Sequence, residues 1–173
     1  MSEVKKTLNN NEVLVDGKRR KDHRYLIGLF DVLKIAGKSY RILFDKKGRI
    51  MVSEISEKES TIKPCKILGK TALGKDKIQF NLHDGKNLIV NVDAKVGDTL
   101  LLKIPQQEVI ETLPLKKGAT VFLTKGKHSG DVGVFKEIKK EEAIYSKDNQ
   151  DIETAKEYLF VIGKEKALLE IKN

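Results

Sequence analysis

Short stretches of alternating or continuous apolar residues recur along most of this 173-residue chain. The clearest strands that this pattern predicts are residues 40–44, 50–52, 78–82, 88–90 and 100–102. Turn signals separate them, such as Asp84-Gly85 between the third and the fourth. Strands spaced roughly ten residues apart with turns between them are typical of β-barrels and β-sandwiches. No long amphipathic helix is predicted, so the fold is expected to be mainly β.

The N-terminal 36 residues have a different pattern. Residues 4–8 are consistent with the last turns of a helix that stops at Asn9-Asn10-Asn11. Residues 12–15 then predict a strand ending in Asp16-Gly17, a strong tight-turn signal. Residues 31–35 predict another strand, and residues 36–38 are expected to form a linker.

The C-terminal part predicts a third unit. Its clearest strands are residues 119–124, 133–138 and 158–162, with a short helical turn at residues 151–156. The predicted organisation is therefore residues 1–36, a β-rich middle over residues 37–112, and a final unit over residues 113–173.

The charge changes the interpretation. A formal net charge of +9 and a pI near 9.4 favour polyanionic partners. The charge is also uneven, because residues 18–24 carry five basic side chains against one acidic, and residues 116–130 carry four lysines and no acid. Two local basic stretches indicate binding surfaces. The alternative for each is a solvated charge run that only aids solubility.

The sequence offers no catalytic or metal-binding constellation. Cys65 is the single cysteine, so neither a disulfide framework nor a zinc-type cysteine pair is predicted. Gly69-Lys70-Thr71 resembles the end of a phosphate-binding loop, but Pro64 stands where that motif needs glycine. His128, Ser129 and Asp131 lie in a glycine-flanked stretch typical of a turn rather than of a triad. We therefore expect no enzyme activity, cofactor, metal or small-molecule substrate.

The N-terminus has no apolar core of signal-peptide length, and no apolar run approaches a membrane span. We expect a soluble, cytoplasmic protein with no membrane partner.

Residues 117–138 resemble a KOW motif, in which two strands meet at a glycine-rich loop that phosphate can approach closely. The resemblance implies a small SH3-like barrel. Lys125 and Lys127 would supply positive charge, and His128 could stack or hydrogen-bond to RNA. The alternative is an ordinary hairpin with a solvated lysine loop.

Residues 3–35 resemble the second half of an S4-type RNA-binding domain, in which a helix packs on a small hairpin. The resemblance implies that a basic edge grips structured RNA, with arginine forking phosphates or stacking on bases. The residues expected to face the phosphates are Lys5, Lys6, Lys18, Arg19, Arg20, Lys21 and Arg24.

The order of these modules resembles the ribosomal protein family S4e of archaeal and eukaryotic small subunits. The blocks that carry the resemblance are residues 13–31, 78–85, 97–105, 113–134 and 153–164. It implies a mainly β fold with a partial α/β S4-type RNA-binding module, a central β-barrel-like domain and a C-terminal SH3-like KOW barrel. It also implies a structural role in translation, with ribosomal RNA and neighbouring small-subunit proteins as partners. Members of the family begin with a basic extension and a further S4-domain helix, so we expect the first module to be incomplete here.

Two other functions stay open at this point. A KOW-containing transcription elongation or antitermination factor would bind polymerase as well as nucleic acid, and would need a protein-docking face. An RNA-modifying enzyme would need a catalytic domain beside the S4-type module, for which the sequence shows no candidate nucleophile.

Overall fold

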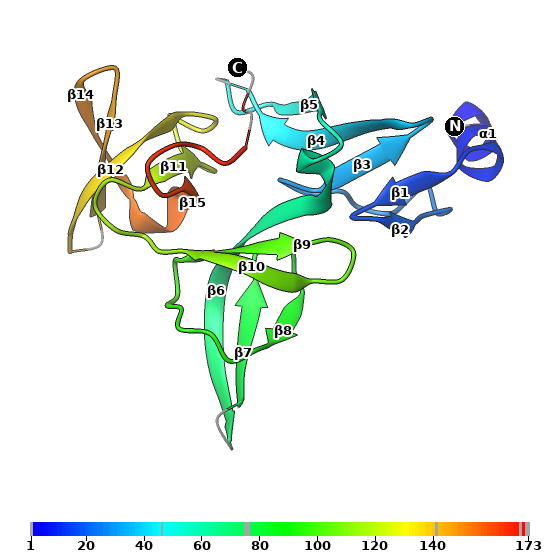
Figure 1. Ribbon diagram of the computed structural model, residues 1–173. Coiled ribbons are helices and arrows are strands. Elements are labelled where there is room, and N and C mark those ends of the chain that lie inside the picture. The colour runs from blue at the N-terminus through cyan, green and yellow to red at the C-terminus, as the bar shows by residue number, and fades with distance from the viewer. Residues whose placement is uncertain (1, 46, 75–76, 141, 170, 172–173) are drawn as a thin grey trace.

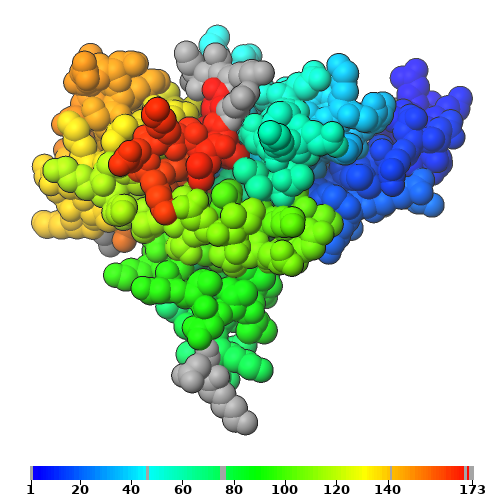
Figure 2. Space-filling view, viewed as in Figure 1, coloured from blue at the N-terminus to red at the C-terminus, as the bar shows by residue number. Residues whose placement is uncertain are grey.

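The chain folds mainly into short antiparallel strands in the computed structural model, which describes residues 2–45, 47–74, 77–140, 142–169 and 171. Within these residues the strands form three five-stranded sheets (Figure 1). The space-filling view shows three lobes, one per sheet, that meet near the centre of the molecule (Figure 2). The expected mainly β fold is confirmed.

The first sheet has the order β2-β1-β3-β4-β5. Its strands are β1 (Val13–Val15), β2 (Lys18–Arg19), β3 (Val32–Ile35), β4 (Lys38–Phe44) and β5 (Ile50–Ile55). The β1–β2 hairpin turns at Asp16-Gly17, as expected, with positive φ at both residues. Ala36-Gly37 makes the same kind of two-residue turn between β3 and β4, with φ of 50° and 79°. The expectation of a linker at residues 36–38 was therefore wrong, because this turn twists in the sense that a tight hairpin needs.

Strands β4 and β5 form the hairpin expected at residues 40–52. The predicted turn covered residues 45–48, of which Lys46 lies outside the described residues. Asp45 stabilises the turn, since its carboxylate accepts hydrogen bonds from the backbone N–H groups of Lys47 and Arg49.

Helix α1 (Ser2–Asn10) precedes the first sheet and buries none of its residues. It ends where the asparagine run predicted, with the Asn11 N–H donating to the Thr7 carbonyl. Across the described part of the chain, no helix is both long and apolar enough to cross a membrane.

The second sheet has the order β10-β9-β6-β7-β8. Its strands are β6 (Ile62–Gly74), β7 (Lys77–Leu82), β8 (Asn87–Ile89), β9 (Thr99–Lys103) and β10 (Glu108–Leu113). The long strand β6 lies at its centre, and the β6–β7 hairpin projects away from the other sheets (Figure 1). Side chains alternate between the faces of a strand, so Lys63 and Lys66 of β6 point to opposite sides.

The third sheet has the order β14-β13-β12-β11-β15. Its strands are β11 (Thr120–Leu123), β12 (Val132–Lys139), β13 (Glu142–Lys147), β14 (Gln150–Ala155) and β15 (Leu159–Gly163). The expected helical turn at residues 151–156 was wrong, because Asp148-Asn149 forms a tight turn with positive φ that pairs β14 with β13. A short 3-10 helix, η2 (Lys156–Tyr158), follows β14.

Each of the last two sheets covers its own apolar core, and a third core joins the first sheet to the third. The joining core contains Phe30, Leu43, Phe122, Phe160, Ile162 and Leu169. Phe30 packs on both Phe122 and Phe160, with ring centroids 5.4 and 4.6 Å apart. The first and third lobes are thus held side by side by aromatic packing.

A buried arginine ties the first sheet to the start of the second. The Arg41 guanidinium on β4 donates to the carbonyls of Glu59 and Ile62, at 2.8 and 3.0 Å. Glu59 opens the 3-10 helix η1 (Glu59–Thr61), which leads into β6. The entry to the central strand is therefore fixed by hydrogen bonds from the neighbouring sheet.

The division into domains stays a prediction. Its first boundary, between residues 36 and 37, lies inside the β3–β4 turn, and the first sheet continues beyond it to Ile55. Its second boundary, between residues 112 and 113, lies at the end of β10.

Candidate nucleic-acid interface

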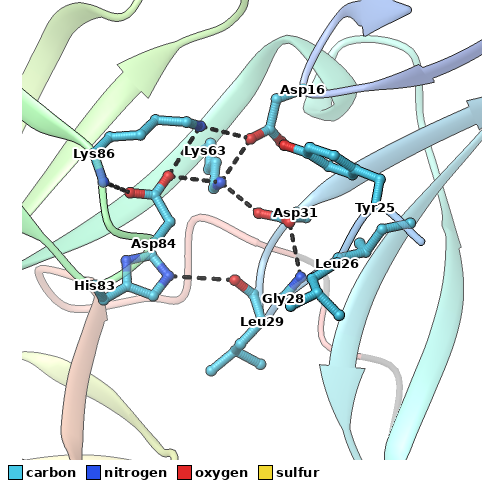
Figure 3. A pocket seen from close by; sticks show the side chains of 11 residues that line it. Asp16, Tyr25, Leu26, Gly28, Leu29, Asp31, Lys63, His83, Asp84 and Lys86 are labelled. Atoms are coloured by element: carbon cyan, nitrogen blue, oxygen red, sulfur yellow. Dashed lines mark hydrogen bonds and ion pairs between the residues drawn. The ribbon is translucent and has the colours of Figure 1, made fainter. Parts of the chain in front are cut away.

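Five charged side chains gather where the first two sheets meet (Figure 3). The Lys63 ammonium lies within 2.9 Å of carboxylate oxygens of Asp16, Asp31 and Asp84. Lys86 bridges Asp16 and Asp84 at 2.9 and 3.0 Å. We call these five residues the ion network. It joins the β1–β2 turn, β6 and the β7–β8 turn, so it connects two sheets through paired charges.

Each charge in the ion network is compensated by its neighbours. Burial raises the pKa of Asp84, but the Lys63 ammonium and the hydrogen bonds from both lysines outweigh it, so that pKa lies well below its usual range. Burial lowers the pKa of Lys63, but the carboxylates of Asp16 and Asp31 outweigh it and raise that pKa. Both shifts favour the charged forms of Asp84 and Lys63, so their ion pair is a structural connection between the two sheets.

A possible cation site beside the network has unsuitable electrostatics. Potential ligand atoms of Cys65, His83 and Asp84 lie within 4.8 Å of one another. However, two lysine ammonium groups already bind Asp84, and burial raises the pKa of the Cys65 thiol to about 12. Both features oppose a cation, since a metal needs thiolate and free carboxylate oxygens.

The basic run predicted as an RNA contact lies at the outer edge of the first sheet. Lys18 and Arg19 form β2, the edge strand, and both are exposed, as are Lys21 and Arg24. Arg20 differs, because its guanidinium lies 4.0 Å from the ring centroid of Tyr25 and is partly covered. The stack fixes the conformation of the segment after β2.

Lys5 and Lys6 of α1 are also exposed. The helix leads into β1 through two residues, so both lysines lie at the same end of the molecule as β2 (Figure 1). We call Lys5, Lys6 and residues 18–24 the N-terminal basic surface.

The predicted KOW loop lies on a different part of the molecule. Lys125 and Lys127 are exposed, and the His128 Nδ1 lies 3.4 Å from a carboxylate oxygen of Asp131. Gly130 has a φ of +87°, and a Cβ there would lie 2.0 Å from the Asp45 carbonyl oxygen. The loop is therefore seated on the β4–β5 turn, at the edge of the first sheet opposite β2. The structure does not bring the two predicted contact regions together.

The structure adds three lysines to the second region that the sequence did not single out. Lys66, Lys140 and Lys156 line one groove together with Lys125. Their segments are far apart in sequence, so local charge density alone could not identify them.

Comparisons with known proteins agree with this architecture. The family model described as Ribosomal family S4e matches residues 36–109. The small ribosomal subunit protein eS4 of Methanosphaera stadtmanae is 42% identical over 98% of this chain and 73% of its own length. The protein of the same name from Methanothermobacter thermautotrophicus is 36% identical, over 98% of this chain and 74% of its own length.

A solved structure gives the same result. The crystal structure of the 30S ribosomal protein S4e from Thermoplasma acidophilum has a TM-score of 0.84 and 27% identity, covering 94% of this chain and 86% of that one. Identity above 30% across nearly the whole chain, together with the shared fold, shows that this chain belongs to the ribosomal protein family S4e.

Proposed function

We propose that this chain is a structural constituent of the small ribosomal subunit that binds ribosomal RNA in the cytoplasm. The supporting relatives carry the name of a small-subunit protein, and theirs is a family of ribosomal proteins, not of enzymes. Neighbouring small-subunit proteins are its other proposed partners. The relatives give no support to the alternative of a transcription elongation factor.

The observation that carries the RNA-binding proposal is the exposure of the N-terminal basic surface on an edge strand. Among the described residues, Lys18, Arg19, Lys21 and Arg24 form no ion pair within 4.0 Å, although the chain has exposed carboxylates elsewhere. Unpaired cations on one edge are free to displace counterions from an RNA backbone. The KOW loop, with Lys125, Lys127 and His128, is the second proposed contact.

Binding through these surfaces would depend on shape and charge more than on base identity. Lysine ammonium groups act as point charges on phosphates and carry no sequence information. The Arg20–Tyr25 stack offers a planar surface in the N-terminal region on which an unstacked base could stack. We therefore expect a preference for folded RNA over duplex DNA.

The test measures affinity for small-subunit ribosomal RNA at several salt concentrations, with duplex DNA of equal length as competitor. Arg19, Lys21 and Arg24 are changed together to alanine, leaving Arg20 in its stack. The magnitude of the log–log salt slope should fall by about 0.7 to 0.9 for each lost phosphate contact.

A matched control removes the same charge elsewhere. Lys34, Lys38 and Lys139 are exposed or half-buried and each pairs with a glutamate. Changing these three to alanine should leave the slope close to that of the wild type. Equal slopes in the two triple variants would contradict the proposed surface, because net charge alone would then account for the binding.

A further inference from the structure

An open groove of about 970 Å³ lies between the central sheet and the third sheet. One side comes from β6 and the β8–β9 connection, including Leu68 and Val96, and the other from the KOW loop, the β12–β13 turn and η2. Figure 2 shows the green central lobe and the yellow-orange third lobe diverging at the lower left. The groove thus lies on the opposite side of β6 from the ion network.

Four lysines and one glutamate line this groove, namely Lys66, Lys125, Lys140, Lys156 and Glu157. In the described part of the chain, none of the four lysines has a carboxylate within 4.0 Å. The four lysines outnumber the one glutamate, so the lining carries net positive charge, and a concave surface focuses the field of like charges.

Lys66 is the least exposed of the four, at 8%. Its Nζ donates one hydrogen bond, to the Glu157 carbonyl oxygen at 2.6 Å. An ammonium has three donors, so two have no protein acceptor among the described residues. A buried cation with unused donors is costly unless an anion completes it.

Resting on the RNA-binding function proposed above, we propose that this groove binds the phosphate backbone of ribosomal RNA, with Lys66 at its floor. At the rim of the groove, the same RNA strand would contact Lys125, Lys140 and Lys156. The groove is continuous with the KOW loop through Lys125, so it extends the second contact toward the central sheet.

The chemistry of the lining favours a phosphodiester strand over an acidic protein segment. All four cations are lysines, which bind phosphate as point charges and need no fixed orientation of its oxygens along a passing backbone. Leu68 and Val96 are more than half exposed beside them and offer apolar surface to a ribose or a base face. An open groove of this size also suits a strand passing through better than an enclosed small ligand.

The electrostatics of Lys66 give the site a local reporter. Burial, followed by the charges of Lys125 and Lys156, lowers the pKa of Lys66 to about 8, although the Glu157 carboxylate opposes this. A bound phosphate would favour the ammonium and raise that pKa. The Lys66 pKa can be followed by NMR of the side-chain Cε and Nζ signals during titration with RNA or with inorganic phosphate.

The first experiment compares salt-dependent RNA affinity of Lys140→Ala/Lys156→Ala with that of Lys38→Ala/Lys139→Ala. All four side chains are exposed, so both double variants should fold. We expect the groove variant to lose about 0.7 to 0.9 of slope for each phosphate contact, and the control to lose none. Equal slopes in the two would overturn the groove, whereas the RNA-binding function would still stand if the Arg19/Lys21/Arg24 variant lost slope.

The second experiment identifies the ligand by the Lys66 pKa. An upward shift of about one unit or more with RNA, and less or none with an acidic peptide of equal charge, would support the groove as an RNA site. A shift with inorganic phosphate but not with RNA would overturn it and leave a small-anion site. An equal shift with the acidic peptide would replace RNA by a protein partner, and no shift with any ligand would also overturn the proposal.

Discussion

Lys63 and Lys66 lie three residues apart on the same strand, yet their surroundings are opposite. Lys63 is almost fully buried among three aspartates, and its pKa is raised. Lys66 is nearly as buried, but it contacts a carbonyl among other lysines, and its pKa is lowered to about 8. Strand alternation separates them, because an odd spacing sends the two side chains to opposite faces of β6.

The difference shows how the two faces of one strand can serve two purposes, joining the sheets on one face and binding a ligand on the other. On one face of β6, two lysines and three aspartates from four segments pair with one another and hold the first two sheets together. On the other face, like charges accumulate between the second and third sheets, at a cost in stability. A protein retains uncompensated buried charge chiefly where function uses it.

The largest effect is expected for Lys63→Met. Among the described residues, the substitution leaves Asp16 and Asp84 with Lys86 alone and Asp31 with no ammonium partner. Removing one partner from a buried ion pair costs about 3 to 5 kcal/mol, so the free energy of unfolding should fall by that order. Urea unfolding at pH 7 measures it. The matched variant Lys103→Met, exposed on β9 of the same sheet, should change it by less than about 0.5 kcal/mol.

A smaller loss, about 1 to 3 kcal/mol at pH 7, is expected for Asp84→Asn, since Lys63 keeps its other two aspartates. The loss should shrink in acid. The folded pKa of Asp84 lies below its unfolded value of about 3.9, so its stabilisation is present above that value and disappears as the pH falls through the folded pKa.

Unfolding free energies of the wild type and Asp84→Asn between pH 7 and pH 3 test this point. The gap between the two curves should begin to narrow below about pH 4. The control Asp93→Asn, at an exposed position, should change the free energy of unfolding at pH 7 by less than about 0.5 kcal/mol. A constant gap for Asp84→Asn would mean that its carboxylate gains nothing from Lys63 on folding.

The hairpins show how far the sequence could predict the fold. Asp16-Gly17 indicated its turn, because both residue types accept positive φ. Ala36-Gly37 did not, because alanine seldom adopts the left-handed region, and so residues 36–38 were interpreted as a linker. Strand β14 was missed for a related reason, since Asp148-Asn149 was not recognised as a turn.

The charge partners could not be predicted from the local sequence. Asp16 meets Lys63 across 47 residues, and the Glu157 carbonyl meets Lys66 across 91. Nothing in the stretch Lys63-Pro64-Cys65-Lys66 tells which lysine will be neutralised. The exposed runs at residues 18–24 and in the KOW loop were identifiable because their charges are contiguous, whereas the groove exists only after four other segments pack beside β6.

On the groove face of β6, replacing lysine by methionine should raise the free energy of unfolding, whereas Lys63→Met lowers it. Lys66→Met removes a buried charge that no carboxylate within 4.0 Å compensates among the described residues, and it keeps most of the side-chain volume. We expect the free energy of unfolding at pH 7 to rise by about 1 kcal/mol. Urea unfolding beside Lys63→Met measures both. If Lys66→Met destabilised the protein as much as Lys63→Met does, the contrast between the two faces would be wrong.

The last prediction concerns the pH dependence of that gain. The folded pKa of Lys66, about 8, lies below its unfolded value of about 10.4, so the unfolded chain holds the proton to higher pH. The wild type therefore gains stability relative to Lys66→Met as the pH rises from about 8 to about 10, where the folded protein alone has lost this charge. The free energy of unfolding is measured for both proteins at pH 7 and at pH 9.5. The difference between the two proteins at each pH cancels the titration of the other lysines. If the stability advantage of Lys66→Met is smaller at the higher pH, the Lys66 charge is uncompensated in the folded protein. If that advantage is larger there, the folded protein stabilises the Lys66 ammonium, as it does that of Lys63.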